Sequence, residues 1–233
     1  MEAKFATRSE AAEALLEILP KEDLRANKFV IVCLSLSSVV LSDILARNLK
    51  LDYEILFSEP IFAPNNLECE IAAVSETKEI LINDNLIKSF NITKDFVFGE
   101  AERKYEEKIL KDIYKYRKGE LLENLVGKNI LLIDEGCETG ATALLAIKTF
   151  MKLNAQSIFY ATPVIPQDII NNLNNFIDEL YYAKKIADFV DVDFYYEDQQ
   201  ANSDQLMKIL EESPYYLPLQ KEINKEKNNA VQS

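Results

Sequence analysis

Histidine is absent from the 233 residues of this chain. Because histidine is the commonest general base of enzymes and a frequent zinc ligand, any chemistry here has to use carboxylates, hydroxyls, lysines or backbone amides. Cysteine is scarce as well. Cys33, Cys69 and Cys137 are odd in number, widely spaced and without a Cys-x-x-Cys pair, which predicts neither a disulfide framework nor a zinc knuckle.

Positive charge is also in short supply, with 26 Lys and Arg against 39 Asp and Glu and a formal net charge of −13. A surface of this sign repels nucleic acid and anionic lipid, so we expect neither as a partner. No apolar run approaches the roughly 18 residues that span a bilayer, and residues 1–20 are too charged for a signal peptide. We therefore expect a cytoplasmic protein that does not contact a membrane.

Apolar runs of strand length alternate with segments of helical periodicity along the chain, which is 48% hydrophobic. We predict strands at residues 29–34, 53–57, 69–75, 79–82, 129–133, 157–162 and 178–182. We predict helices at residues 11–19, 39–49, 93–118 and 140–153, and one beginning near Pro166. Near-continuous apolar strands between helices indicate a three-layer α/β fold, in which an open, mostly parallel sheet has helices on both faces.

The domain organisation follows from the same pattern. Residues 1–212 are expected to form one domain, and residues 213–233 a C-terminal tail. The end of the chain is rich in Lys, Glu and Asn, which is typical of a solvated and partly disordered segment. Apolar faces on the predicted helices make a homodimer a reasonable expectation.

The stretch ILLIDEGCETGATALL, residues 130–145, carries the strongest functional signal. Asp134 and Glu135 directly follow a predicted strand, at the end where open parallel sheets bind their ligands. Either acid alone could simply cap a turn. Two adjacent carboxylates followed by Thr139, Gly140 and Thr142 at the start of a helix favour a binding site instead.

One interpretation of this stretch is a degenerate DxGxGxG loop of an S-adenosylmethionine-dependent methyltransferase. Asp134, Gly136 and Gly140 match it, but Glu138 stands where the middle glycine lets the backbone approach the ligand. The next predicted strand runs into Pro163 and lacks the acid that would bind ribose hydroxyls. This alternative is the weaker one.

The same residues, 130–142, resemble the signature of type I phosphoribosyltransferases, in which an apolar strand is followed by two acids, three variable positions and Thr-Gly-x-Thr. Residues 67–76, 82–87, 161–170 and 192–200 look like segments of a bacterial branch of predicted phosphoribosyltransferases whose substrates are unassigned. The resemblance implies a type I phosphoribosyltransferase-like fold with a small hood or flap. It also implies a small-molecule ligand, phosphoribosyl pyrophosphate or a nucleoside 5′-phosphate, and a place in nucleotide metabolism.

The resemblance also assigns roles to residues. Asp134 and Glu135 would accept hydrogen bonds from the ribose hydroxyls, favour an oxocarbenium-like transition state and contact Mg²⁺ directly or indirectly. Glu138 would assist proton movement on the acceptor. Backbone amides at the helix start would bind the 5′-phosphate, assisted by the helix dipole. These amides belong to Glu138, Thr139, Gly140, Ala141 and Thr142.

The predicted pyrophosphate loop departs from the family pattern. The family usually has a basic residue and Gly-Gly after the first sheet strand, and the corresponding residues here are Ser35, Leu36, Ser37 and Ser38. An Arg-Lys pair expected after the second strand is replaced by Ser58 and Glu59. Two hypotheses follow: an active transferase that passes the phosphoribosyl group to a nitrogenous base, and a module that binds or senses a ribose phosphate or nucleotide without turnover.

Overall fold

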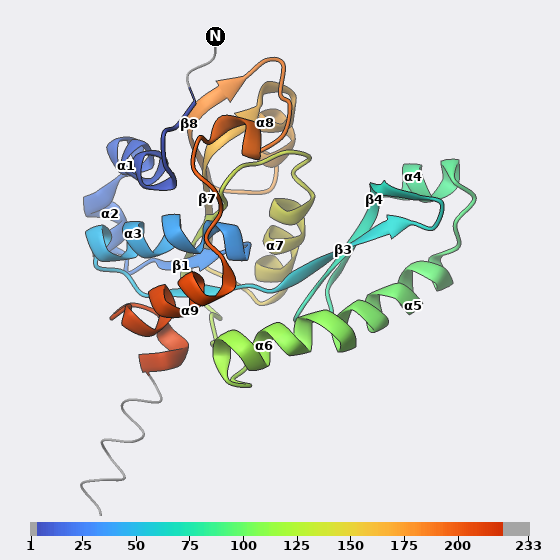
Figure 1. The fold of residues 1–233 in the computed structure, drawn as a ribbon, viewed down its shortest axis with the longest axis horizontal. Helices are drawn as coiled ribbons and strands as arrows, with labels where there is room; N and C mark the ends of the chain where they lie inside the picture. Colours follow the sequence, from blue (N-terminus) through green and yellow to red (C-terminus); the bar gives the residue numbers. More distant parts are fainter. Residues whose placement is uncertain (1–3, 221–233) are drawn as a thin grey trace, which may run out of the picture.

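Five parallel strands form the central sheet of the computed structural model, which describes residues 4–220 (Figure 1). They lie in the order β2–β1–β6–β7–β8. Their bounds are Val30–Cys33 (β1), Tyr53–Ile55 (β2), Asn129–Ile133 (β6), Ser157–Pro166 (β7) and Glu179–Ile186 (β8). Each corresponds to a strand predicted from the apolar pattern, and the predicted α/β fold with a mostly parallel sheet is confirmed.

Helices cover both faces of this sheet, as predicted. On one face lie α1 (Arg8–Ile18), α2 (Lys21–Ala26), α3 (Val39–Leu49) and α9 (Ser203–Glu212), and on the other α7 (Ala141–Lys152) and α8 (Gln167–Leu173) (Figure 1). Alternate residues of a strand point to opposite faces. Ile31 and Cys33 therefore pack with α1 and α3, whereas Val32 packs with α7.

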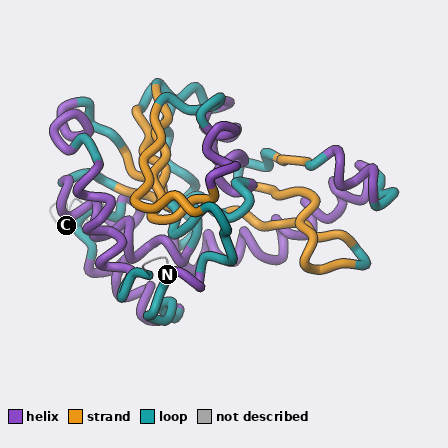
Figure 2. Tube along the Cα trace, turned by 90° about the horizontal axis from the view of Figure 1, so that it is seen from above, coloured by secondary structure: helices purple, strands orange, loops and turns teal. Residues whose placement is uncertain are grey.

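Residues 58–117 extend away from the central sheet, and we call them the arm (Figures 1 and 2). The arm contains a second sheet, which is antiparallel. Its strands are β3 (Ser58–Ala63), β4 (Asn66–Ser75) and β5 (Ile80–Ile82). Its helices are α4 (Asp84–Ser89), α5 (Lys94–Lys104), the π-helical turn η2 (Tyr105–Ile109) and α6 (Leu110–Arg117). This small sheet fits the predicted hood or flap, and α5 to α6 confirm the long helix predicted at residues 93–118.

A buried ion pair fixes the base of the arm to the central sheet. The Arg117 side chain is fully buried, forms a salt bridge with Glu76 and lies 3.3 Å from Glu54 Oε1 on β2. The guanidinium group also lies over the Phe57 ring, 4.8 Å from its centroid. One cation at the end of α6 thus offsets part of the charge of two buried carboxylates from separate elements, and buried charges need such a partner.

Part of the predicted tail lies outside the described residues, since these end at Gln220. Within the described part, Tyr216 is fully buried and its ring lies 5.2 Å from that of Tyr53. Its hydroxyl donates to the backbone carbonyl of Tyr116 at 3.1 Å. In residues 4–220, no helix is long and apolar enough to cross a membrane.

Candidate functional site

The strand order places two of the predicted loops next to each other. From β1 the chain continues to β2 on one side of the sheet, and from β6 it continues to β7 on the other, so the order reverses between β1 and β6. In the register of this pair Cys33 lies opposite Ile133. Residues 35–38 and 134–140 therefore leave the sheet side by side, at the switch point where such folds bind ligands.

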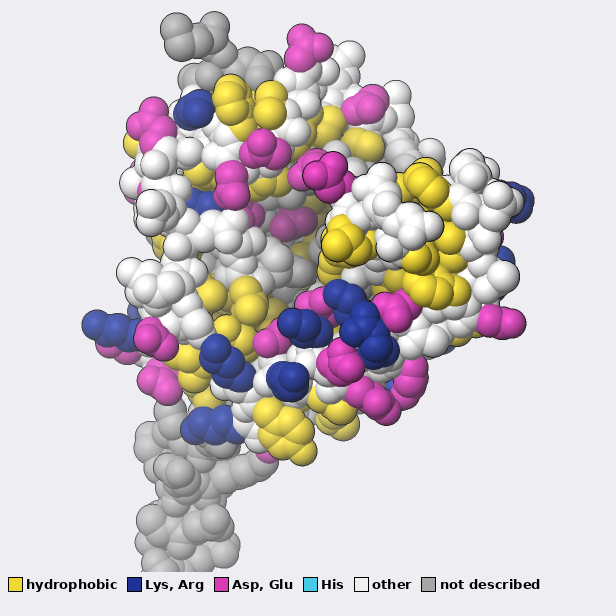
Figure 3. Space-filling model, turned by 45° about the vertical axis from the view of Figure 1, so that its right-hand side comes forward, with side chains coloured by type: hydrophobic (Ala, Val, Ile, Leu, Met, Phe, Trp, Pro, Cys, Tyr) yellow, Lys and Arg dark blue, Asp and Glu magenta, His cyan; other side chains and the backbone are white. Residues whose placement is uncertain are grey.

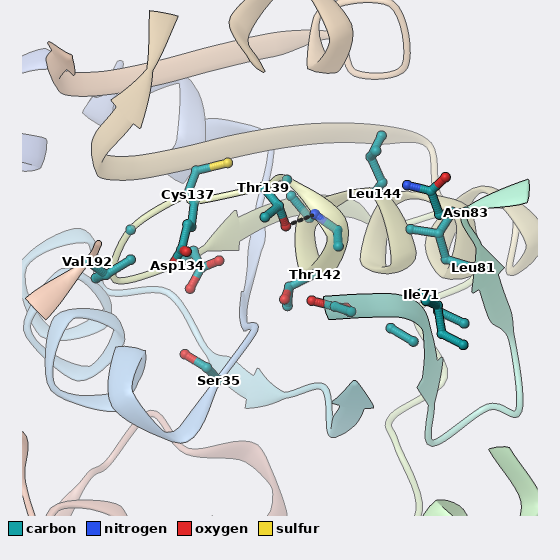
Figure 4. A pocket seen from close by; sticks show the side chains of 18 of the residues that line it. Ser35, Ile71, Leu81, Asn83, Asp134, Cys137, Thr139, Thr142, Leu144 and Val192 are labelled. Carbon is teal, nitrogen blue, oxygen red and sulfur yellow. Dashed lines mark hydrogen bonds between the residues drawn. The ribbon is translucent and has the colours of Figure 1, made fainter. Parts of the chain in front are cut away.

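A cavity of about 1020 Å³ opens at this point, between the central sheet and the arm. Figure 3 shows acidic side chains around the hollow, with most of the lysines and arginines in that view below it. Figure 4 shows Ser35, Asp134 and Thr142 on one side and Ile71, Leu81 and Asn83 of the arm on another. Asp191, Val192, Asp193 and Gln200 complete the wall. No lysine or arginine is among the described residues that line it.

The start of α7 forms a nest of backbone N–H groups. Gly140 has φ +77°, a left-handed conformation in which a side chain is strained, and a Cβ there would lie 3.1 Å from Ile169. The first helical hydrogen bond runs from Leu144 to Gly140. Within residues 4–220 the amides of Glu138, Thr139 and Thr142 donate to no protein acceptor.

Two of the five predicted amides are already used. The Ala141 amide donates to Thr139 Oγ1 at 3.3 Å, the bond drawn in Figure 4. The Gly140 amide donates to the Cys137 thiol. Burial raises the pKa of that thiol to about 12, so Cys137 fills space in the loop and is not a nucleophile.

Asp134 and Glu135 are both buried at the floor of the cavity, with 8% and 2% of their surfaces exposed. Burial raises the pKa of Asp134 to about 7; the neighbouring Glu135 charge acts in the same direction, and a hydrogen bond from the Glu135 amide opposes it. Burial also raises the pKa of Glu135, against the opposing effects of Ser37 and Arg8. Two adjacent, poorly solvated acids are thus held beside the backbone amides at the start of α7.

Ser35 and Ser37 bring the predicted pyrophosphate loop into contact with these acids. The Ser35 hydroxyl opposes the rise in the pKa of Asp134, and the Ser37 hydroxyl opposes that of Glu135. The loop is also closed on itself, because the Ser35 amide donates to Ser38 Oγ and the Ser38 amide to Ser35 Oγ. Ser38 is fully buried and Leu36 packs against the main core. Of the four predicted residues, only Ser35 and Ser37 face the cavity.

Glu138 is exposed and stands between the main cavity and a second one of about 960 Å³. The second cavity is lined by α8, Tyr182, Lys185 and residues 187–190. Across the main cavity, Glu70 of β4 has its pKa raised to about 7 by burial and by the charge of Glu138. Glu138 therefore faces both spaces that an acceptor molecule could occupy.

Sequence reasoning missed Arg8, whose guanidinium group forms a buried salt bridge with Glu135. The two residues are 127 positions apart, and nothing in the local pattern around Arg8 indicates the contact. Asp193 and Gln200 lie in residues 192–200, a segment that resembles the family, but the sequence assigned them no role at the site. Only the topology, which brings α1 against β7 and β8, places these side chains at the site.

Comparisons with known proteins agree with the signature. Two curated proteins, from Mycobacterium tuberculosis strains CDC 1551 and H37Rv, are each 23% identical over 176 residues, or 76% of this chain. Both are named "Putative phosphoribosyl transferase". The aligned part is 39% of each relative, so the chain spans about two-fifths of their length. No family model matches the chain.

The fold is shared with the crystal structure of TT1426 from Thermus thermophilus, at a TM-score of 0.72 and 23% identity over 90% of this chain and 99% of that one. A purine phosphoribosyltransferase from Pyrococcus horikoshii covers 87% of this chain and 97% of its own at a TM-score of 0.49 and 14% identity, too distant to support an inference. The resemblance to phosphoribosyltransferases is thus confirmed in sequence by the curated relatives.

Proposed function

We propose that this protein binds phosphoribosyl pyrophosphate with Mg²⁺ and transfers its phosphoribosyl group to a nitrogenous base. The observation that carries the proposal is the placement of unused amides and twin buried acids at one switch point. The amides of Glu138, Thr139 and Thr142, at the positive end of α7, suit a 5′-phosphate. Charge-assisted hydrogen bonds of this kind contribute about 1.5–3 kcal/mol each.

In this proposal Asp134 and Glu135 accept hydrogen bonds from the two ribose hydroxyls. Their charge would stabilise the positive charge that develops on the ribose ring as the bond between C1 and pyrophosphate breaks. Because both carboxylates are poorly solvated, such stabilisation is stronger than it would be in water. Glu138, between the two cavities, is placed to accept or return a proton on the acceptor.

The residues present fit a magnesium ion that arrives with the substrate. In residues 4–220, no three Cys, Asp or Glu side chains are arranged to hold a metal ion by themselves. Mg²⁺ commonly takes one or two carboxylates, with substrate oxygens and water as its other ligands, and Asp134 and Glu135 supply that number. When bound, the ion would neutralise pyrophosphate charge that no lysine or arginine of the described lining neutralises.

A second function, binding of a ribose phosphate or nucleotide without turnover, is favoured by the pyrophosphate loop. The Ser35 amide donates to the Ser38 hydroxyl, and the Ser38 amide donates to the Ser35 hydroxyl. Fewer backbone donors are therefore left to bind the pyrophosphate leaving group. Glu59, where the family has a cation, pairs with Lys104 at 3.2 Å inside the arm. Both features would weaken pyrophosphate binding while leaving the 5′-phosphate nest intact.

Release of pyrophosphate decides between the two functions. The protein is incubated with phosphoribosyl pyrophosphate, Mg²⁺ and a panel of purine and pyrimidine bases, with an Asp134→Asn/Glu135→Gln variant as the control. Release that depends on both a base and the two acids supports the transferase. Calorimetric binding without release on any base supports the binding module. In either case we expect a cytoplasmic protein that acts on small molecules and not on nucleic acid.

A further inference from the structure

We propose that Arg8 is a positioning residue, which holds the Glu135 carboxylate in the orientation that binds the ribose hydroxyls. This inference rests on the proposed function. Arg8 is the first residue of α1 and is 2% exposed. Its Nε and Nη2 both contact Glu135 Oε1, so the guanidinium group engages one oxygen of the carboxylate from two of its nitrogens. Glu135 still lines the cavity.

The backbone of Glu135 is held from a second direction. The Tyr196 hydroxyl donates to the Glu135 carbonyl at 2.6 Å. The same tyrosine ring lies under the Arg8 guanidinium group, 4.6 Å from its centroid. Arg8 and Tyr196 therefore fix the side chain and the main chain of Glu135 together, and the acid has little freedom to change rotamer.

Two backbone hydrogen bonds between Phe5 and the segment after β8 bring Arg8 to this position. The Phe5 amide donates to the Tyr195 carbonyl at 2.9 Å, and the Glu197 amide donates to the Phe5 carbonyl at 3.0 Å. Asp198 accepts three hydrogen bonds from Arg8. Its Oδ1 lies 2.6 Å and its carbonyl oxygen 2.8 Å from Nη1, and its Oδ2 lies 3.0 Å from the Arg8 amide nitrogen. The segment that carries Asp198 also contributes Asp193 and Gln200 to the cavity wall.

The charges around Glu135 explain why a cation is needed there. Asp134 is its neighbour in the chain, and Asp193 Oδ1 lies 3.5 Å from Arg8 Nη2. Among the described residues, Arg8 lowers the pKa of Glu135 and the Asp193 charge raises it. Without Arg8, Glu135 would lie beside like charges with no cation, and its side chain would move away from the floor of the cavity. A displacement of about 1 Å at a reacting centre can cost about 100-fold in rate.

The test compares two ligands that differ by one hydroxyl, ribose 5-phosphate and 2-deoxyribose 5-phosphate, by calorimetry in the presence of Mg²⁺. Wild type is expected to bind the ribose form more tightly, because its 2-hydroxyl reaches the acids. Arg8→Met, which keeps an unbranched apolar side chain but removes the guanidinium group, should lose about tenfold or more in affinity for ribose 5-phosphate. Its affinity for the deoxy sugar should change less than about threefold, because the phosphate nest does not involve Arg8.

Arg8→Lys is the conservative partner, and it should restore part of the preference for ribose. If Arg8→Met loses affinity for both sugar phosphates equally, Arg8 only supports the fold. If the preference for ribose is unchanged, Arg8 has no role at Glu135. Either result overturns the inference. Should Arg8→Met fail to fold, Arg8→Lys decides by the same comparison, since one ammonium cannot keep all the guanidinium contacts. A wild-type protein that binds neither sugar phosphate would instead overturn the proposed function.

Discussion

At the scale of single residues, the site combines groups that are costly to bury. Asp134 and Glu135 lie almost out of contact with water beside hydroxyls of Ser35 and Ser37. Such an arrangement lowers the stability of the free protein and is typical of sites whose ligand or metal supplies the missing counter-charge. The residue scale therefore offers tests of the site that need no substrate.

Asp134→Asn is expected to change how stability depends on pH. Burial raises the pKa of Asp134 from its usual 3.8 to about 7. The folded protein therefore keeps this proton while the unfolded chain loses it, and stability falls as pH rises from about 4 to about 7. The variant has no such titration, so at pH 8 it should be more stable than wild type by about 4 kcal/mol, and at pH 4 nearly equal to it. Urea unfolding at both pH values measures this; a constant difference would contradict it.

Gly136→Ala should destabilise the protein by about 1–3 kcal/mol, because a Cβ at this position would lie 2.7 Å from Val192 Cγ1 and 3.0 Å from Val164 Cγ2. Adding Val192→Ala should recover part of that loss by removing the nearer methyl groups. Gly99→Ala, in α5 with no atom within 4 Å of the new Cβ, is the matched control and should stabilise by about 0.5–1 kcal/mol. If all three variants melt together, the close packing of Gly136 against Val192 is wrong.

At the scale of elements, the sequence predicts all five strands of the central sheet, because most of them are apolar runs, and it predicts four of the six helices that cover it. Helix Val39–Leu49 even begins and ends at the predicted residues. Strand β3 was missed, since it begins with Ser58, Glu59 and Pro60 and lacks an apolar run. Helix α9 was missed as well, although Asn202 and Gln205 form a capping box at its start.

The candidate site likewise contains residues that a local sequence pattern predicts and residues that it does not. The acids and the amide nest are contiguous in the chain, so the signature contains them. The pyrophosphate loop could be placed after β1 by topology, but burial of Ser38 and packing of Leu36 depend on the turn that the loop forms. Arg8 and Asp193 reach the site only through contacts between distant segments, which no local pattern encodes.

The junction between the arm and the sheet supplies an element-scale prediction. Arg117→Met removes the buried cation that forms a salt bridge with Glu76 and lies against Glu54, and breaking such a buried ion pair costs about 3–5 kcal/mol. Arg103→Met is the control, because its partners Glu100 and Glu107 form exposed pairs on α5 that contribute about 0–1 kcal/mol. Denaturant unfolding of both variants tests the difference. A loss below about 1 kcal/mol for Arg117→Met would contradict the role given to this junction.

At the scale of the whole molecule, an acidic protein can hold the proposed anionic ligand only where the ligand meets positive charge. The chain has a formal net charge of −13, and the described lining of the main cavity holds no lysine or arginine. A polyanion entering such a cavity meets repulsion from every nearby carboxylate. The positive end of α7 and a divalent cation are the two sources of attraction that the fold can use.

Removal of divalent metal is therefore expected to abolish binding of phosphoribosyl pyrophosphate. Calorimetry with Mg²⁺ should give a measurable affinity, and an excess of EDTA should weaken it by about 100-fold or more, because the pyrophosphate charge is then unneutralised. Inorganic phosphate, which needs only the nest, is the control and should change by less than about threefold. If EDTA leaves the affinity for phosphoribosyl pyrophosphate unchanged, the prediction is wrong. A cationic side chain outside the described lining would then neutralise the pyrophosphate charge.

The most direct test of the account is a crystal structure of the protein soaked with ribose 5-phosphate and Mg²⁺. The account predicts the phosphate on the amides of Thr139 and Thr142, with the ribose hydroxyls against Asp134 and Glu135. A sugar phosphate bound anywhere else, or a switch point that stays empty at saturating ligand, would contradict it.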